Sequence, residues 1–279
     1  STPSGLAQIS AFASDGEKNN AAIFVYGGDL LGNVWRFDIN AVTVTKFAIL
    51  KDANGGAVQP ITTKLELGQV LAVDGLHRVV YVGTGQYLAQ SDLADTQQQT
   101  IYAIKDDDTP GGAVTATLDA HATSALVQQT MTVSGNNRSA ASPPQVVNFS
   151  TDRGWLVDLP VSGERISVAP QLVQGTLLVP TTIPSSTVCS PGGESWLNFF
   201  DYRNGGAVGT GGLVGVRASG LIVGMNVFYI TDPITGKIVP KVNIVTGLDP
   251  TPELVKDPPF STSGSGFQKK RAIWRELIQ

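Results

Sequence analysis

Residues 22–39 read AIFVYGGDLLGNVWRFDI, and this stretch decides the fold that the sequence predicts. Its first run, residues 23–26, is aromatic and β-branched, which is typical of a buried strand. A Gly-Gly-Asp triplet at 27–29 interrupts that run, and the Gly-Asn pair at 32–33 predicts a turn. Residues 34–38 then alternate between apolar and polar side chains. The stretch therefore predicts a β-hairpin with one face in a core.

Five residues of this hairpin are expected to have structural roles. Gly28 lets the backbone leave the strand tightly, and Gly32 tolerates a positive φ. Asp29 is placed to accept hydrogen bonds from N–H groups of the turn. Trp35 carries a large apolar surface to the interface between sheets, where its N–H is expected to meet a carbonyl. A Trp35 ring that stacks on a ligand is the alternative, and Asp38 ends the second strand.

Similar units recur along the chain. Each has an apolar run, a Gly or Thr break, a spacer, and an aromatic-bearing strand that ends in Asp or Lys. The later units lie within residues 79–105, 154–159 and 175–201. Repetition of a sheet unit is the sequence signature of a propeller, and such a unit must stack on its neighbours to bury its own face.

The sequence therefore predicts an all-β fold, a β-propeller or part of one. We expect about four to five blade-like antiparallel sheets in a single domain over residues 1–279. Trp155, Trp196 and Trp274 are expected to pack between sheets as predicted for Trp35. The last of these lies in residues 271–277, which alternate in polarity and predict a closing strand.

The spacers between these units are predicted to be loops with short helical insertions. The longest insertion is 106–148, and we expect it to display variable surface together with residues 86–99 and 184–194. A short helix is predicted at 91–97, and further helix around 122–130. Val42 to Leu50 predicts an additional strand.

Composition limits the class of protein. Hydrophobic residues make up 42% of the 279 residues and charged residues only 15%, so the chain is expected to fold. The net charge is −4 and the sequence pI about 5.1, which disfavours a nucleic-acid binder. The short basic run at 269–271 is interpreted as a solvated edge. The uncharged apolar stretch at 218–230 is too short to span a membrane, so no transmembrane segment is predicted.

The single cysteine, Cys189, leaves two alternatives open. It pairs with a cysteine outside this sequence, or it is a small buried apolar residue. The chain begins with Ser rather than Met and shows no signal peptide, so we expect a fragment of a longer secreted protein.

Catalysis has little support in the sequence. His77 and His121 lie far apart, and with one cysteine they make no zinc ligand set. Ser195 does not lie in a Gly-x-Ser-x-Gly elbow, and Cys189 has no His beside it in the sequence to lower its pKa. We therefore predict that the chain is not an enzyme.

Several motifs, in order from about residue 20 to 279, resemble the C-terminal domain of the PilY/PilC family of type IV pilus biogenesis proteins and tip-associated adhesins. They are Tyr26-Gly-Gly-Asp-Leu-Leu-Gly-Asn-Val-Trp-Arg-Phe-Asp38, Gly83-Thr-Gly-Gln-Tyr-Leu88, Asp95-Thr-Gln-Gln-Gln99, Pro191-Gly-Gly-Glu-Ser-Trp196 and Trp274-Arg-Glu-Leu277. Each motif is modest alone, and their order makes the resemblance specific.

The resemblance implies a modified β-propeller similar in its blades to quinoprotein dehydrogenases. It implies a secreted protein at the outer membrane, cell surface or pilus tip. The expected function is support of pilus biogenesis by opposing retraction, together with adhesion and twitching motility. The implied partners are pilin or minor pilin subunits and a host-cell surface. The alternative is a quinoprotein-like scaffold or dehydrogenase in the periplasm, although the strands show no convincing set of convergent acids and amides.

Some family members bind calcium through a loop that resembles an EF-hand, just ahead of the hallmark strand. In this chain Asp15, Glu17 and Asn19 alternate there, as oxygen ligands would. However, Lys18 adds an opposing charge and the closing carboxylate is missing. These residues are therefore weak metal candidates, and a plain hydrophilic turn is the favoured interpretation. The acidic run at 106–108 is interpreted as solvated.

Overall fold

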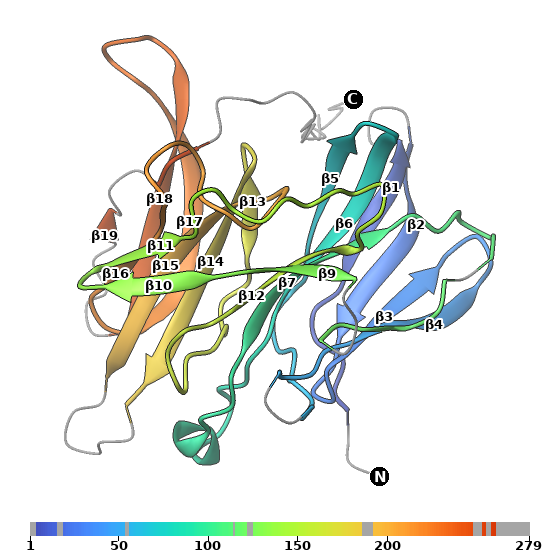
Figure 1. Cartoon of the computed structure of the whole chain (residues 1–279), viewed down its shortest axis with the longest axis horizontal. Coiled ribbons are helices and arrows are strands. Elements are labelled where there is room, and N and C mark those ends of the chain that lie inside the picture. The colour runs from blue at the N-terminus through green and yellow to red at the C-terminus, as the bar shows by residue number, and fades with distance from the viewer. Residues whose placement is uncertain are drawn as a thin grey trace, which may run out of the picture.

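The computed structural model describes residues 4–15, 19–53, 56–113, 115–121, 125–185, 192–247, 253–254 and 258–260. These residues form nineteen strands and one short 3₁₀ helix, η1 (Gln90–Ala94). The prediction of an all-β chain is confirmed. The strands belong to four separate sheets, which stand side by side across the molecule (Figure 1).

The first and second sheets have five strands each. The first sheet has the order β1 (Ser10–Asp15), β2 (Asn19–Gly28), β3 (Asn33–Asp38), β4 (Thr43–Ile49) and β8 (Leu118–Asp119). The second sheet has the order β5 (Glu66–Ala72), β6 (Gly75–Gly83), β7 (Thr100–Asp106), β12 (Gly154–Asp158) and β9 (Leu126–Gln129).

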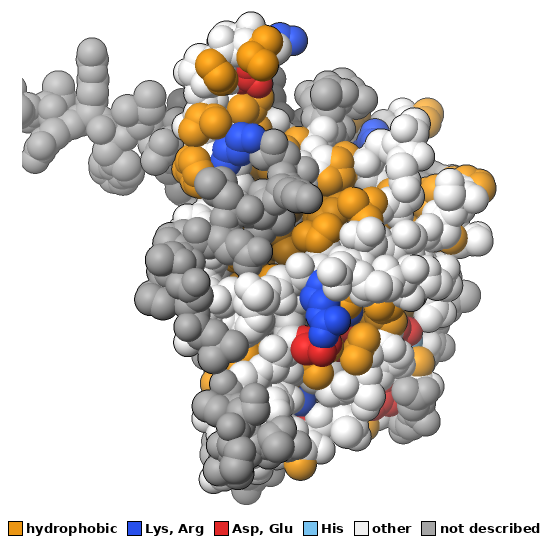
Figure 2. Space-filling model, turned by 90° about the vertical axis from the view of Figure 1, so that its left-hand side faces the viewer, with side chains coloured by type: hydrophobic (Ala, Val, Ile, Leu, Met, Phe, Trp, Pro, Cys, Tyr) orange, Lys and Arg blue, Asp and Glu red, His pale blue; other side chains and the backbone are white. Residues whose placement is uncertain are grey.

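The third sheet has six strands and the fourth has three. The third has the order β10 (Met131–Ser134), β11 (Asn137–Ala140), β16 (Leu213–Ala218), β15 (Gly193–Asp201), β14 (Thr176–Pro184) and β13 (Gln171–Val173). The fourth has the order β17 (Ile222–Thr231), β18 (Ile238–Thr246) and β19 (Glu253–Leu254). Its β17–β18 hairpin projects beyond the other sheets, and hydrophobic side chains gather on the projecting part (Figures 1 and 2).

Three hydrophobic clusters hold the four sheets together in series. One cluster joins the first sheet to the second, one the second to the third, and one the third to the fourth. Strand β6 shows how this works, because Val80 packs into the core with the first sheet while Val79 and Tyr81 pack into the core with the third. Successive side chains of a strand point to opposite faces, so both faces of this sheet are buried.

Stacking of neighbouring sheets is what a repeated sheet unit requires, but closure into a ring is a separate matter. Among the described strands, no pairing joins one sheet to another. The propeller itself therefore remains a prediction. The expectation of antiparallel sheets holds for most pairs, and it is wrong for β9 with β12 and β4 with β8, which pair in parallel.

The helix predictions differ in outcome. The short helix expected at 91–97 is present as the 3₁₀ helix η1 at Gln90–Ala94. The helix expected around 122–130 is wrong, because the described residues 126–129 form strand β9. Tertiary pairing explains the difference: β9 lies beside β12, and its Leu126 and Gln129 are buried there. The strand expected at 42–50 is β4, Thr43–Ile49.

Candidate functional site

Asp29 organises the hallmark turn between β2 and β3. Its carboxylate accepts hydrogen bonds from the main-chain N–H groups of Leu31 and Asn33, both at 2.9 Å. The Asn33 side-chain amide also donates to it, at 2.9 and 3.1 Å, and the Trp35 indole Nε1 donates at 2.8 Å. Asp29 is 1% exposed, so this buried carboxylate is surrounded by donors. The hydrogen bonds to Asp29 therefore fix the conformation of this turn.

The glycines of this turn are held in close quarters. Gly32 has a φ of +72°, and an added Cβ would lie 2.6 Å from the Leu50 carbonyl oxygen. At Gly28, an added Cβ would lie 2.3 Å from the Ile61 side chain. The neighbouring Asn33, which the sequence placed in the turn, instead begins strand β3.

Trp35 takes a different place from the one predicted. Its indole N–H donates to the Asp29 carboxylate rather than to a carbonyl, so that part of the prediction is wrong. The ring is half-buried, lies outside the three hydrophobic clusters, and has the Lys46 ammonium 5.4 Å from its centroid. The hydrogen bond to the Asp29 carboxylate holds the indole N–H at the turn.

Asp38 connects the end of β3 to a distant loop. Its carboxylate accepts from the main-chain N–H groups of Asn40 and Ala41, each at 2.9 Å, and of Gly111 at 2.6 Å. The hydrogen bond from Gly111 is the main cause that lowers the pKa of Asp38 below its usual value. Asp38 thus ends the strand and also fixes the loop at 106–113.

The other predicted tryptophans have distinct surroundings. Trp155 is fully buried between the second and third sheets, with its centroid 6.3 Å from the rings of both Tyr81 and Phe200. Its indole N–H donates to the Tyr202 carbonyl at 3.2 Å. Trp196 is 2% exposed and lies under the Arg138 guanidinium, 4.1 Å from the ring centroid, and no described atom accepts its N–H.

Several predicted residues lie outside what the structure describes. Glu17, Cys189 and Trp274 fall outside the described residues, and so does the side chain of Asp15. Asn19 is described, and its side-chain oxygen accepts the Ala21 main-chain N–H at 2.9 Å. Among the described residues, no three His, Cys, Asp or Glu side chains come together as a metal site. Calcium binding here therefore remains a prediction.

Two buried ion pairs were missed at the sequence level. Arg36 lies 2.9 Å from Asp106 and 2.5 Å from Asp108, and Tyr26 donates its hydroxyl to Asp106. These groups cross from the first sheet to the second. Aspartates 106 and 108, predicted to be solvated, are 2% and 9% exposed, so that interpretation is wrong for them.

The second buried pair joins Arg138 of β11, in the third sheet, to Glu164 in the loop between β12 and β13. The Arg138 guanidinium donates hydrogen bonds to both Glu164 carboxylate oxygens, at 2.6 and 2.8 Å, and both side chains are fully buried. The Asn198 amide oxygen accepts from the same guanidinium at 2.9 Å. Buried charges of this kind are stable only when they are paired and hydrogen-bonded.

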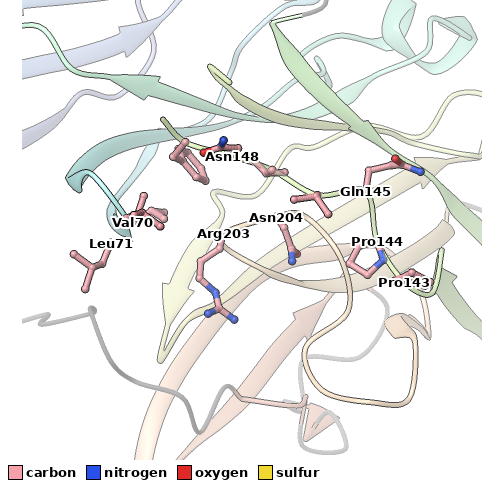
Figure 3. Close-up of a pocket in the computed structure, with 13 residues that line it drawn as sticks. Val70, Leu71, Pro143, Pro144, Gln145, Asn148, Arg203 and Asn204 are labelled. Carbon is pink, nitrogen blue, oxygen red and sulfur yellow. The ribbon is translucent and has the colours of Figure 1, made fainter. Parts of the chain in front are cut away.

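An open groove of about 540 Å³ lies between the second and third sheets. Figure 3 shows Val70 and Leu71 of β5 on one side, Pro143 and Pro144 on the other, and Arg203 beside them. The residues that line it come from three segments: 70–73, 143–149 and 203–204. Most of these side chains are apolar, so the groove is suited to apolar groups of a partner molecule.

The rim of the groove is exposed while its walls are anchored. Leu71, Val73 and Val146 are 56%, 104% and 84% exposed. The lining segment at 143–149 is fixed to β9, because the Gln145 N–H donates to the Gln129 side chain at 2.9 Å and the Gln129 amide donates back to the Gln145 carbonyl at 2.8 Å. The apolar rim is therefore presented by a fixed backbone.

His77 fastens the β5–β6 turn that forms one wall. Its Nδ1 lies 2.8 Å from Asp107 and its Nε2 lies 2.9 Å from Asp74, while its ring stacks on Phe149. Burial would lower the pKa of His77, but the hydrogen bonds to the two carboxylates outweigh it and raise the pKa. The hydrogen bond between His77 and Asp74 is also the main cause that lowers the pKa of Asp74 to about 2.

Comparison with known proteins identifies the relatives of this chain. No family model matches it. A type IV pilus biogenesis factor PilY1 homolog of Xylella fastidiosa is 31% identical over 222 residues, which cover 73% of this chain and 14% of the relative. PilY1 of Pseudomonas aeruginosa is 26% identical over 249 residues, covering 73% of this chain and 21% of the relative.

A solved structure agrees in fold. The crystal structure of the Pseudomonas aeruginosa PilY1 C-terminal domain matches with a TM-score of 0.68 and 22% identity, over 87% of this chain and 59% of that one. The chain belongs to the PilY/PilC family. It spans only a small part of its PilY1 relatives, 14% and 21% of the two named above. Among its described residues, no helix is long and apolar enough to cross a membrane.

Proposed function

We propose that this chain acts in type IV pilus biogenesis by binding other proteins rather than by catalysis. The observation that carries the proposal is its 31% identity over 222 residues to a relative named as a type IV pilus biogenesis factor. The fold match to the PilY1 C-terminal domain supports it. Neither relative's name mentions an enzymatic activity.

The groove between the second and third sheets is the binding surface that the geometry supports best. It combines about 540 Å³ of open volume with an exposed apolar rim on an anchored backbone. Apolar side chains on such a surface favour a protein partner, because binding removes them from water. We propose a pilin or minor pilin subunit as that partner.

The finer roles follow from the same proposal. By holding a pilus subunit, a secreted protein at the outer membrane, cell surface or pilus tip opposes retraction, and so supports twitching motility and adhesion, including adhesion to a host cell. Calcium binding at Asp15 to Asn19 belongs to the same set of proposals, and calorimetry with calcium would test it.

The groove is tested with Val73→Asp and Val146→Asp, which put a carboxylate on its exposed rim. Val42→Asp is the matched control, because Val42 is 88% exposed and lies in the β3–β4 turn, outside the three segments that line the groove. Its φ of +54° is tolerated better by Asp than by Val, so the control should fold normally. We expect the groove variants to lose at least tenfold in binding to purified pilin and minor pilin subunits, and the control to bind normally.

The cellular test uses the source bacterium. Deleting the gene should reduce surface pili, and removing the retraction motor from the deletion strain should restore them. Complementation with the groove variants should fail where the control succeeds. Normal subunit binding and normal piliation by both groove variants would contradict the groove as the binding surface. Normal piliation of the deletion strain would contradict the pilus function.

A further inference from the structure

Strand β17 has an unpaired outer edge without the usual protection. It pairs with β18 on one side, and no described strand pairs with it on the other. Its ten residues, IVGMNVFYIT, contain no charge and no proline. Edge strands are commonly protected from other chains by Lys, Pro, or bulges that twist the edge away. The single irregularity in β17 lies at its start, between Ile222 and Gly224.

The hydrogen bonds show which main-chain groups face outward. The carbonyl of Met225 accepts the Gln171 side-chain amide at 3.1 Å, so it points away from β18. At the other end, Asp232 donates its N–H to the Lys237 carbonyl of the hairpin at 2.8 Å, so it points inward. Because the direction alternates along an antiparallel strand, the N–H and C=O groups of Val227, Tyr229 and Thr231 point outward.

The partner strand β18 is protected on its own outer edge. Pro240 lies opposite Tyr229, at a position whose N–H would point outward, and proline has none. Farther along, Asn243 and Ile244 are covered by β19. The two edges of this hairpin therefore differ, and only the edge of β17 offers a run of free main-chain groups among the described residues.

The side chains around this edge are apolar and exposed. Phe228, Tyr229 and Ile230 of β17 are 40%, 56% and 38% exposed. Hydrophobic side chains gather on the part of the molecule where this hairpin projects (Figure 2). A charged partner strand would bury its charges against this apolar edge, so the edge selects an uncharged, β-prone strand. Strand β17 itself meets that requirement.

We propose that β17 pairs antiparallel with β17 of a second copy of this chain. A two-fold axis at Tyr229 places Tyr229 opposite its own copy and Val227 opposite Thr231, which allows about six main-chain hydrogen bonds between copies. Phe228 then lies beside Ile230 of the other copy. The product is a six-stranded sheet, with three strands from each copy, which is of ordinary width. This inference is independent of the proposed function.

The size of this interface sets the expected affinity. Two six-residue stretches bury on the order of 1,000 Å² in total, which is at the low end for specific interfaces. We therefore expect a reversible dimer with a Kd of about 10–500 µM. Sedimentation velocity from about 5 µM to 1 mM should show a monomer at the low end of that range and a growing dimer fraction at the high end.

Two variants at one position test the pairing. Tyr229→Pro removes an N–H that faces the second copy and leaves the ladder with β18 in place, so it should stay monomeric throughout the range. Tyr229→Thr keeps the N–H and should dimerise within about threefold of the original Kd. Circular dichroism and the melting temperature check that Tyr229→Pro is folded. A monomeric parent chain at 1 mM, or normal dimerisation of folded Tyr229→Pro, would overturn the proposal.

Cross-linking tests the register without relying on a proline. In a Cys189→Ser background, Tyr229→Cys places two thiols opposite each other at a spacing that a disulfide can bridge. Ile234→Cys is the matched control, since Ile234 is 92% exposed at the hairpin tip and does not face its own copy. We expect mild oxidation to give covalent dimers at least tenfold faster for Tyr229→Cys. Equal rates would contradict the two-fold pairing.

Discussion

Replacement of Asp29 by alanine tests whether the hallmark turn is a structural unit of the fold. The carboxylate is 1% exposed and accepts from four donor groups: two main-chain N–H groups, the Asn33 amide and the Trp35 indole. The Asn33 N–H and its side-chain amide are buried, whereas the Leu31 N–H and the Trp35 indole are only partly buried. Water can replace the carboxylate at the partly buried donors.

The expected loss follows from the two buried donors. A buried polar group left without its partner costs about 1–3 kcal/mol, so Asp29→Ala should lower the free energy of unfolding by about 2–6 kcal/mol. Asp232→Ala is the matched control. Asp232 accepts the N–H groups of Ile234 and Thr235 at 2.8 and 2.9 Å in a similar turn, but that turn is exposed. Asp232→Ala should therefore lower the free energy of unfolding much less than Asp29→Ala does.

Urea unfolding followed by circular dichroism measures both variants. Asp29→Ala should move the midpoint to lower urea with little change in slope, because the surface exposed on unfolding is the same. Equal midpoints for Asp29→Ala and Asp232→Ala would refute the reasoning, since the two turns differ chiefly in burial. A changed slope would instead show that the variant altered the native or denatured state.

Three further predictions concern packing, charge and pH. Glu164→Gln leaves Arg138 buried with a neutral partner, so urea unfolding should show a loss of about 3–5 kcal/mol, and a loss below about 1 kcal/mol would contradict it. Gly28→Ala places a Cβ 2.3 Å from the Ile61 side chain and should cost about 1–3 kcal/mol by the same assay, unlike Gly211→Ala, whose Cβ meets nothing. The pKa of His77 is raised in the folded chain, so protonated His77 stabilises the fold fully below the pKa that it has in the unfolded chain, and this stabilisation is lost as the pH rises through the folded-state pKa. The melting temperature of the parent chain should therefore fall relative to that of His77→Gln between about pH 6 and 9. Parallel melting-temperature curves for the two proteins would refute this.

Local chemistry was enough to predict the β2–β3 hairpin. An apolar run, a Gly-Asp break and a glycine at the turn act within a few residues, so they can be read without knowing the rest of the fold. The acceptor role of Asp29 toward the turn has the same local origin. The place of Trp35 could not be read in this way. It depends on whether the ring turns toward the carboxylate six residues earlier or toward another sheet.

The helix predicted around 122–130 failed for a different reason. The composition near Ala125 suits a helix, but the parallel ladder from Leu126 to Gln129 is completed by residues 154–157 of β12. A strand partner so distant in the chain leaves no local signal. The prediction that Asp106 and Asp108 are solvated failed for a similar reason. Three adjacent acids usually indicate a solvated turn, and their partner Arg36 lies about 70 residues away in the sequence.

The groove is beyond local prediction as well, because it exists only where three distant segments meet. Residues 143–148 fell within the spacer at 106–148, which was predicted to display variable surface. In the structure they bring prolines and valines to the end of β5. One signal was available for the charged residues. In a chain with only 15% charged residues, Arg36 stands within the apolar strand β3, which indicates a buried partner.

The order of the stack explains why apolar surface remains on β17. The central strands carry continuous buried runs, such as Val79 to Val82 in β6, because cores lie on both of their faces. Strand β17 is buried near its start, at Ile222 and Met225, where it meets the third sheet, and is exposed from Phe228 onward. The exposed half keeps the same strand-forming, uncharged composition. A soluble hairpin has no need of that composition, whereas a hairpin that receives a further strand does, and this is why the free edge of β17 is better interpreted as an interface than as solvent-facing surface.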